Sequence, residues 1–127
     1  MDPTQTRDGG DTAGVGQFLA DDLLAVNVVP SSRGTVVTVL PTGEIDFVTA
    51  PVLRSALLSC LRPPCRQVIV DLDGVTFLGC AGLTVLAEAH HLAKADGMDF
   101  TLRGGHGAAL RPLQVTGLWK QLAPSPG

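Results

Sequence analysis

Hydrophobic and polar positions near the beginning of the chain predict two strands joined by a turn. Residues 23–29 and 35–40 are rich in β-branched and apolar side chains, and the five residues between them, 30–34, are typical turn formers. Two such runs around a glycine-containing loop are typical of a β-hairpin. We therefore expect an antiparallel pair of strands at the start of the domain.

Two longer segments have apolar residues at helical spacing. The first begins at Thr49, whose hydroxyl is a candidate N-cap, has Pro51 in its first turn and ends before Pro63. The second follows a turn at Asp73 and a short approach at residues 75–78, and it ends at Gly97, a typical C-terminal cap. The apolar faces predicted from the spacing are Leu53, Ala56, Leu57, Cys60 and Leu61 for the first helix, and Gly82, Val85, Leu86, Ala89 and Ala93 for the second.

Two further strands and a last helix complete the pattern. Residues 68–70 form a nearly continuous apolar run, as in a strand buried on both faces, whereas residues 98–103 alternate between apolar and polar, as in a strand with one buried face. A third helix is expected at 108–116. The order β-β-α-β-α-β-α predicts one α/β domain, a mixed β-sheet with an N-terminal β-hairpin and three to four α-helices.

The ends of the chain lack the large apolar residues needed to form a core. We expect a disordered N-terminal tail at 1–16, a folded domain at 17–123 and a short flexible C-terminal tail at 124–127. No apolar stretch approaches the ~20 residues of a membrane span, and the N-terminus lacks the pattern of a secretion signal. These features predict a cytoplasmic protein with no membrane contact.

Composition excludes several functional classes. The net charge is -3 and the lysines and arginines are scattered, which argues against nucleic acid as a partner. Three cysteines, an odd number, do not suggest a disulfide framework. His90 and His91 are adjacent and so point in different directions, and no metal-ligand spacing is found. The glycine-rich segment 104–107 lacks the Lys-Ser/Thr of a phosphate-binding loop, and we interpret it as a flexible connector. No nucleophile, base and orienting group can be assembled, so we expect a non-enzymatic protein without a cofactor.

The most informative segment is the start of the second helix. After Leu78 come four small residues, Gly79, Cys80, Ala81 and Gly82. A helix start has unpaired backbone N–H groups and a positive dipole end, and small side chains let another surface approach closely. Tight packing of the helix against the sheet explains the same residues, and the pattern alone favours that interpretation.

Several segments together resemble the STAS domain. Residues 43–46 (Gly-Glu-Ile-Asp) and 49–54 (Thr-Ala-Pro-Val-Leu-Arg) resemble that family's "GELD…TA..LR" pattern, and 68–86 resembles its strand, "F-[ML]-D-S-S-G-L" loop and second helix. The likeness extends over residues 23–122. A stand-alone domain of this length is most similar to bacterial anti-sigma factor antagonists. The resemblance implies a GHKL-type, kinase-like anti-sigma factor as partner, and a binding surface at Asp46 and 78–82.

The segment departs from the family at the residue that is normally phosphorylated. The resemblance places Gly79 at the family's aspartate, Cys80 at its first serine and Ala81 at its phosphoacceptor serine. Alanine has no hydroxyl, so phosphorylation at this position is excluded. Either binding is constitutive and limited by concentration, or another signal acts. Cys80 is a candidate redox switch because a helix N-terminus can lower a thiol's pKa, although it can equally be a small replacement for serine.

The remaining cysteines and the alternatives complete the expectations. Cys60 lies on the apolar face of the first helix and should be in the core, whereas Cys65, beside two prolines, should be exposed in a loop. One alternative function is a redox-sensing STAS module that uses Cys80. Another is a STAS subunit of a larger assembly, such as a stressosome or a lipid-transport complex. For the leading hypothesis we expect a monomer or weak homodimer.

Overall fold

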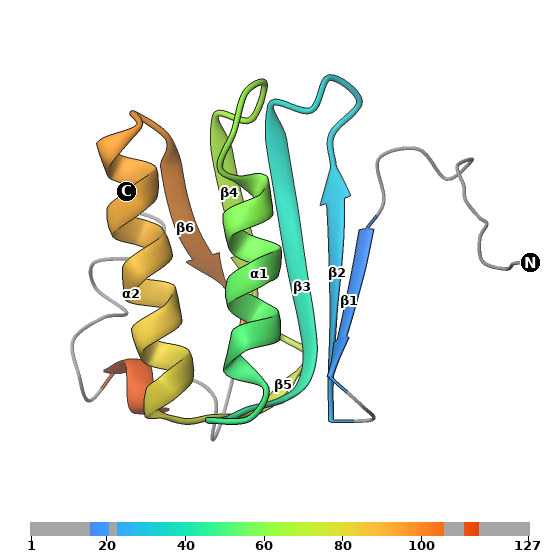
Figure 1. Cartoon of the computed structure of the whole chain (residues 1–127), viewed down its shortest axis with the longest axis vertical. Coiled ribbons are helices and arrows are strands. Elements are labelled where there is room, and N and C mark those ends of the chain that lie inside the picture. The colour runs from blue at the N-terminus through green and yellow to red at the C-terminus, as the bar shows by residue number, and fades with distance from the viewer. Residues whose placement is uncertain (1–15, 21–22, 106–110, 115–127) are drawn as a thin grey trace, which may run out of the picture.

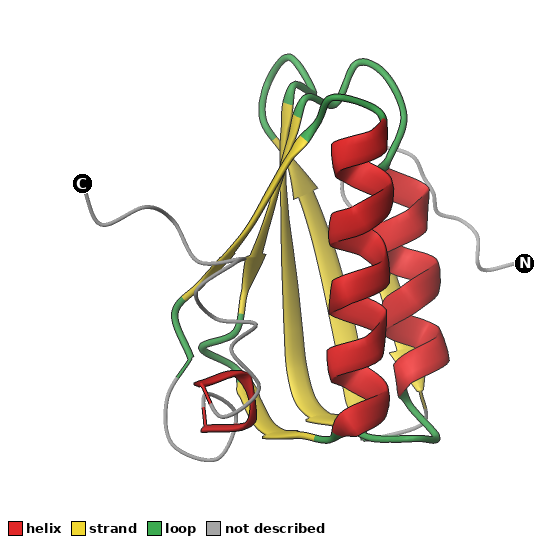
Figure 2. Ribbon diagram, turned by 90° about the vertical axis from the view of Figure 1, so that its left-hand side faces the viewer, coloured by secondary structure: helices red, strands yellow, loops and turns green. Residues whose placement is uncertain are grey.

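The fold is a mixed β-sheet with two long helices packed side by side on one face (Figures 1 and 2). The computed structural model describes residues 16–20, 23–105 and 111–114. The sheet order is β1-β2-β3-β4-β6. The first part of β3 pairs with β4, and its last residues pair with β5. The strands are β1 (Gly16–Ala20), β2 (Leu24–Pro30), β3 (Val36–Ile45), β4 (Gln67–Asp71), β5 (Val75–Leu78) and β6 (Asp99–Arg103).

Strand direction alternates from β1 to β3 and is then the same from β3 to β6. β1, β2 and β3 are antiparallel neighbours, so the predicted N-terminal hairpin is confirmed as β2 and β3. β4 pairs in parallel with both β3 and β6, and β5 pairs in parallel with β3. The connections between parallel strands pass through the helices, which places the carboxyl ends of β3, β4, β5 and β6 at the same end of the molecule (Figure 1).

The core lies between the sheet and the two helices, α1 (Ala50–Cys60) and α2 (Cys80–Ala95). The predicted apolar faces are confirmed: every predicted position is buried except Leu61, which is half-buried and packs against the core. The left-handed conformation of Gly97, with φ of +73°, ends α2 as expected. The alternation predicted around Phe100 is also confirmed, with Met98, Phe100 and Leu102 buried.

Two strands were not predicted, and one prediction about burial was wrong. Residues 16–20 form the edge strand β1, and 75–78, expected to be only an approach to the second helix, form β5. In β4 the burial alternates, with Val68 and Val70 buried but Ile69 only partly so. The reason is that α1 and α2 cover only one face of the sheet (Figure 2).

The C-terminal part of the fold is described only in part. Residues 111–114, inside the predicted third helix, are helical and lie on the side of the sheet away from α1 and α2 (Figure 2). Leu113 of this turn is fully buried. The remainder of that predicted helix, residues 1–15 of the tail predicted at 1–16 and the predicted tail at 124–127 lie outside the described residues. Gly16, the last residue of the predicted N-terminal tail, belongs to β1 instead.

Candidate functional site

The site is formed where the carboxyl ends of β3 and β5 meet the amino ends of α1 and α2, at the lower end of the molecule in Figure 1. In open α/β sheets, this end of the strands is the usual place for binding. The two strand–helix junctions are joined directly, because the Gly79 N–H donates to the Ile45 carbonyl at 2.9 Å. The structure therefore places Asp46 and residues 78–82 on one end of the fold.

The turn after β3 is organised by Asp46. Its carboxylate accepts hydrogen bonds from the N–H groups of Val48 and Thr49, both at 2.9 Å. The hydrogen bond from the Thr49 backbone, followed by that from Val48, lowers the pKa of the Asp46 carboxyl despite partial desolvation. The side chain is half-exposed and ionised at neutral pH, so it both fixes the turn and adds negative charge to this surface.

The Thr49 hydroxyl does not cap α1, contrary to the prediction. Thr49 is fully buried and has helical backbone angles, with φ of -92° and ψ of -19°. This conformation directs the hydroxyl back to the end of β3, where it donates to the Glu44 carbonyl at 2.7 Å and accepts from the Asp46 N–H at 2.9 Å. Thr49 thus anchors the turn from within the core, and Asp46 holds it from the surface.

The predicted small residues at the start of α2 divide into two groups. Leu78 and Gly82 are buried, and a Cβ on Gly82 would lie 2.6 Å from both Ile45 Cγ2 and Leu78 Cδ1, so tight packing accounts for this glycine. Gly79 and Ala81 are half-buried and Cys80 is exposed. Gly79, in extended conformation, provides no side-chain cap for the N–H groups that begin the helix. Residues 79–81 are therefore the part of the loop that reaches the surface.

Cys80 is far from the other two cysteines. Cys60 ends α1 and Cys65 precedes β4, both at the upper end in Figure 1, whereas Cys80 begins α2 at the lower end. The length of α1, about 16 Å for 11 residues, separates these ends, and a disulfide needs Cα atoms within about 7 Å. A bridge between Cys80 and either of the others within one molecule is excluded.

The structure corrects the prediction for Cys65 and confirms that for Cys60. Cys65 is 3% exposed rather than exposed in a loop, because the chain turns inward at the start of β4 and the thiol donates to the Gln67 carbonyl. Cys60 is 6% exposed and lies in the core. Burial raises the pKa of both thiols, which disfavours the reactive thiolate.

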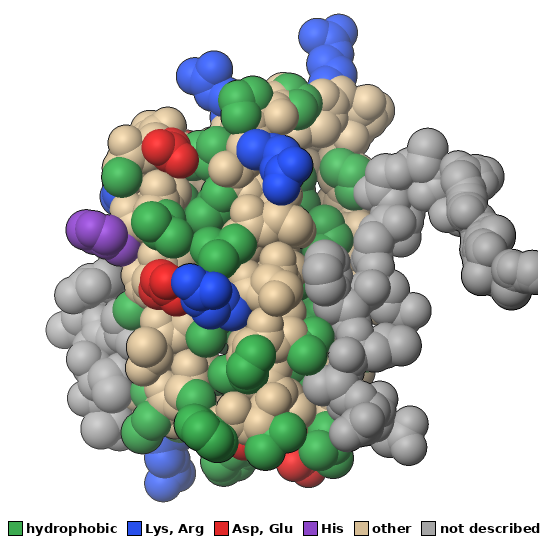
Figure 3. Space-filling view, in the orientation of Figure 1, with side chains coloured by type: hydrophobic (Ala, Val, Ile, Leu, Met, Phe, Trp, Pro, Cys, Tyr) green, Lys and Arg blue, Asp and Glu red, His purple; other side chains and the backbone are tan. Residues whose placement is uncertain are grey.

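Three exposed apolar side chains at this end were not singled out from the sequence. Phe47 is 85% exposed, Val48 67% and Phe77 47%. Figure 3 shows hydrophobic side chains at the same lower end, with acidic side chains beside them and a basic side chain at its left-hand edge. A Phe-Val pair directly after a strand looks like its continuation, so the only signal for a turn was the preceding Gly-Glu-Ile-Asp motif and the helix start at Thr49.

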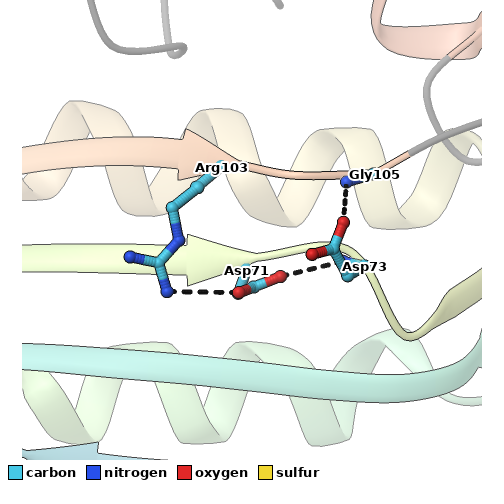
Figure 4. Close-up of polar contacts among 4 residues, drawn as sticks. All are labelled: Asp71, Asp73, Arg103 and Gly105. Atoms are coloured by element: carbon cyan, nitrogen blue, oxygen red, sulfur yellow. Dashed lines mark hydrogen bonds and ion pairs between the residues drawn. The ribbon is translucent and has the colours of Figure 1, made fainter.

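Two acidic side chains also make polar contacts at the carboxyl ends of β4 and β6 (Figure 4). Asp71 pairs with Arg103 at 3.1 Å and accepts a hydrogen bond from the Asp73 N–H. Asp73 in turn accepts from the Gly105 N–H at 2.8 Å. The described half of the predicted flexible connector is therefore held in place by a carboxylate of the protein itself. Residues 106 and 107 lie outside the described ranges.

Metal and histidine chemistry find no support within the described ranges. No group of three or more His, Cys, Asp or Glu side chains there could hold a metal ion. His90 packs edge-to-face against Phe100 with ring centroids 6.1 Å apart, and burial lowers its pKa. No helix in the same part of the chain is both long and apolar enough to cross a membrane.

Comparison with known proteins gives the family. The STAS domain matches residues 27–125. The chain is 29% identical, over 80% of its own length and 80% of the relative's, to the anti-sigma-F factor antagonist RsfB of Mycobacterium tuberculosis. It is also similar to the crystal structure of an anti-sigma factor antagonist from Mycobacterium paratuberculosis, with 33% identity, a TM-score of 0.71, and coverage of 84% of this chain and 91% of that one.

The fold also matches a more distant protein. The anti-sigma factor antagonist SpoIIAA of Bacillus aligns with a TM-score of 0.67 over 80% of this chain and 89% of its own, at 14% identity, which shows a shared fold alone. The mixed sheet, the two helices on one face and the matched residues agree. The chain belongs to the STAS domain family and is homologous to anti-sigma factor antagonists.

Proposed function

We propose that this protein is itself an anti-sigma factor antagonist: it binds an anti-sigma factor and thereby releases the sigma factor that the partner held. The support comes from homology over most of both chains to proteins of that name. The proposed mode of action is non-enzymatic, because the protein acts by occupying its partner.

The proposed docking surface is the first turn of α2 together with the Asp46 turn. The observation that carries it is the exposure of Cys80 and the partial exposure of Gly79 and Ala81 at a helix start without a side-chain cap. Uncapped N–H groups and the positive end of the helix dipole favour an acceptor group on an approaching partner. Leu78 and Gly82 contribute from beneath, by holding the helix start against β3.

We propose further that this surface is not controlled by phosphorylation at the usual position. Ala81 has no hydroxyl to accept a phosphoryl group. In relatives with a serine there, a phosphate would add about -1.5 to -2 charges to a fitted interface. Binding by this chain would then depend on its concentration. Redox control at Cys80 remains an alternative prediction, favoured only by the exposure of that thiol.

The test compares the protein with its Ala81→Ser variant. Each is incubated with ATP and a kinase-active, GHKL-type anti-sigma factor that binds the protein, and intact mass is measured. We expect no phosphate on the unchanged protein and one phosphate on the Ala81→Ser variant. Only the variant has a hydroxyl at the position that is phosphorylated in the family. Phosphate on Thr76 or Thr84 of the unchanged protein, both exposed, would show that the switch has been assigned to the wrong residue.

A further inference from the structure

We propose that Phe47, Val48 and Phe77, here called the apolar triad, anchor the anti-sigma factor, and that the partner presents an apolar pocket with a basic rim. This inference rests on the proposed function and names the chemistry of the partner's surface. The triad borders the helix start from two sides: Phe47 and Val48 belong to the turn after β3, and Phe77 to β5.

Two members of the triad, Phe47 and Val48, are unusually exposed among the described residues, whereas Phe77, at 47%, is only slightly more exposed than the others. The other large exposed hydrophobic residues there, Leu23, Val29 and Leu92, are between 38% and 42% exposed. Phe47 and Val48 are far more exposed, at 85% and 67%, and they are consecutive. Single exposed apolar side chains are common on proteins, but several together around one loop are typical of an interaction surface.

The turn that presents Phe47 and Val48 is fixed in advance. The Asp46 carboxylate holds the N–H groups of Val48 and Thr49, and the buried Thr49 hydroxyl holds the end of β3. These bonds involve backbone atoms and the side chains of Asp46 and Thr49, so they do not explain why residues 47 and 48 are apolar. A fixed turn also lowers the entropy that is lost on binding, which favours a role as an anchor.

Phe77 connects the triad to the helix start. Its ring lies 3.2 Å from the position that a Cβ on Gly79 would take, so the absence of a side chain at Gly79 leaves room for the ring. Phe77 is also the cross-strand partner of Glu44, whose side chain is exposed. A partner that covers residues 79–81 would therefore meet Phe77 and an acidic side chain together.

Charge around the triad defines the partner. Segments 41–53 and 73–84 contain the carboxylates Glu44, Asp46 and Asp73 and no lysine or arginine. Arg54, the next residue of α1, is paired with Glu88, and the exposed Arg111 belongs to the separate helical turn at 111–114. The complementary surface is a nonpolar pocket with lysines or arginines at its edge. A second copy of this chain is disfavoured as the occupant, because a symmetric dimer through this face would bring Glu44 and Asp46 against their own copies.

The experiment measures affinity for each purified anti-sigma factor of the organism that encodes this chain, by calorimetric titration. We expect the double variant Phe47→Ser, Val48→Ser to bind at least about tenfold more weakly than the unchanged protein, since exposed apolar anchors provide much of the affinity of an interface. Its thermal midpoint should not fall, because both side chains are outside the core. Glu44→Lys should also bind more weakly than the unchanged protein, and this loss of affinity should be larger at low salt than at high salt.

Matched controls and the other outcomes separate the claims. Val29→Ser and Leu92→Ser change hydrophobic residues that are also exposed but lie at the opposite end, and they should bind normally. If the unchanged protein binds and the double variant binds equally well, the triad is not an anchor but the proposed function stands. If the unchanged protein binds no anti-sigma factor, both proposals fail. A dimer in sedimentation that the double variant abolishes would make a second copy the occupant and overturn the partner assignment.

Discussion

Ala81→Asp is expected to weaken binding of the anti-sigma factor about 100-fold, or about 2.7 kcal/mol. Ala81 is half-buried in the first turn of α2, so a carboxylate there would be enclosed when a partner covers residues 79–81. An enclosed charge without a partner of opposite sign is strongly unfavourable. The substitution imitates, at this position, the negative charge that phosphorylation introduces in relatives with a serine.

The fold should tolerate this change. Aspartate keeps the Cβ of the alanine, and a carboxylate in the first helical turn interacts favourably with the helix dipole, by about 0.3–1 kcal/mol, which offsets the lower helix propensity of aspartate. Ala81→Asn is the matched control, because it has nearly the same size without the charge and should bind more tightly than Ala81→Asp. Equal affinity of Ala81→Asp and the unchanged protein in the same titration would place the interface elsewhere.

Gly82→Val is expected to lower the free energy of unfolding by roughly 2–3 kcal/mol. The Cβ alone would lie 2.6 Å from Ile45 Cγ2 and from Leu78 Cδ1. Ile45 is fully buried and its Cγ2 is close to the backbone, so β3 or α2 must shift to make room. Denaturation by urea measures the change.

The control for that substitution is Ala95→Val, which introduces the same β-branched residue at an exposed position of the same helix. It includes the lower helix propensity of valine, a few tenths of a kcal/mol up to about 0.7. Because glycine has an even lower helix propensity than valine, propensity alone would make Gly82→Val slightly stabilising, so a loss at Gly82→Val that exceeds the loss at Ala95→Val comes from the steric clash. A loss at Gly82→Val no larger than that at Ala95→Val would mean that the glycine is not required for packing.

The spacing of apolar residues correctly predicted the helices and strands that bury one face against a neighbouring element. The helical spacing around Leu86 and the alternation around Phe100 identified the buried faces of α2 and β6, because α1 and the sheet cover one face of α2 and α2 covers one face of β6. The hairpin of β2 and β3 followed from the turn between them. The proposed docking segment at 78–82 was predicted from its resemblance to a family, since its small residues alone were also consistent with tight packing.

Tertiary contacts determined what the pattern could not predict. Cys65 lies beside two prolines but is buried where the chain enters β4, and β1 is a strand only because β2 offers its edge. The Thr49 hydroxyl was predicted to cap α1 but holds the end of β3, and the Asp46 carboxylate accepts the hydrogen bond of the Thr49 N–H. Both contacts depend on the Thr49 backbone angles. The exposure of Phe47 depends on the turn that Asp46 fixes, and no pattern around residue 47 predicted it.

The most direct test of the docking surface is amide hydrogen exchange on the protein, free and bound to its anti-sigma factor. Uncapped N–H groups at the start of α2 should exchange readily in the free protein. We predict that binding slows exchange at residues 46–49 and 79–83 and leaves the opposite loops, residues 61–66 and 96–98, unchanged. Slower exchange at those opposite loops, with none at the start of α2, would contradict the account.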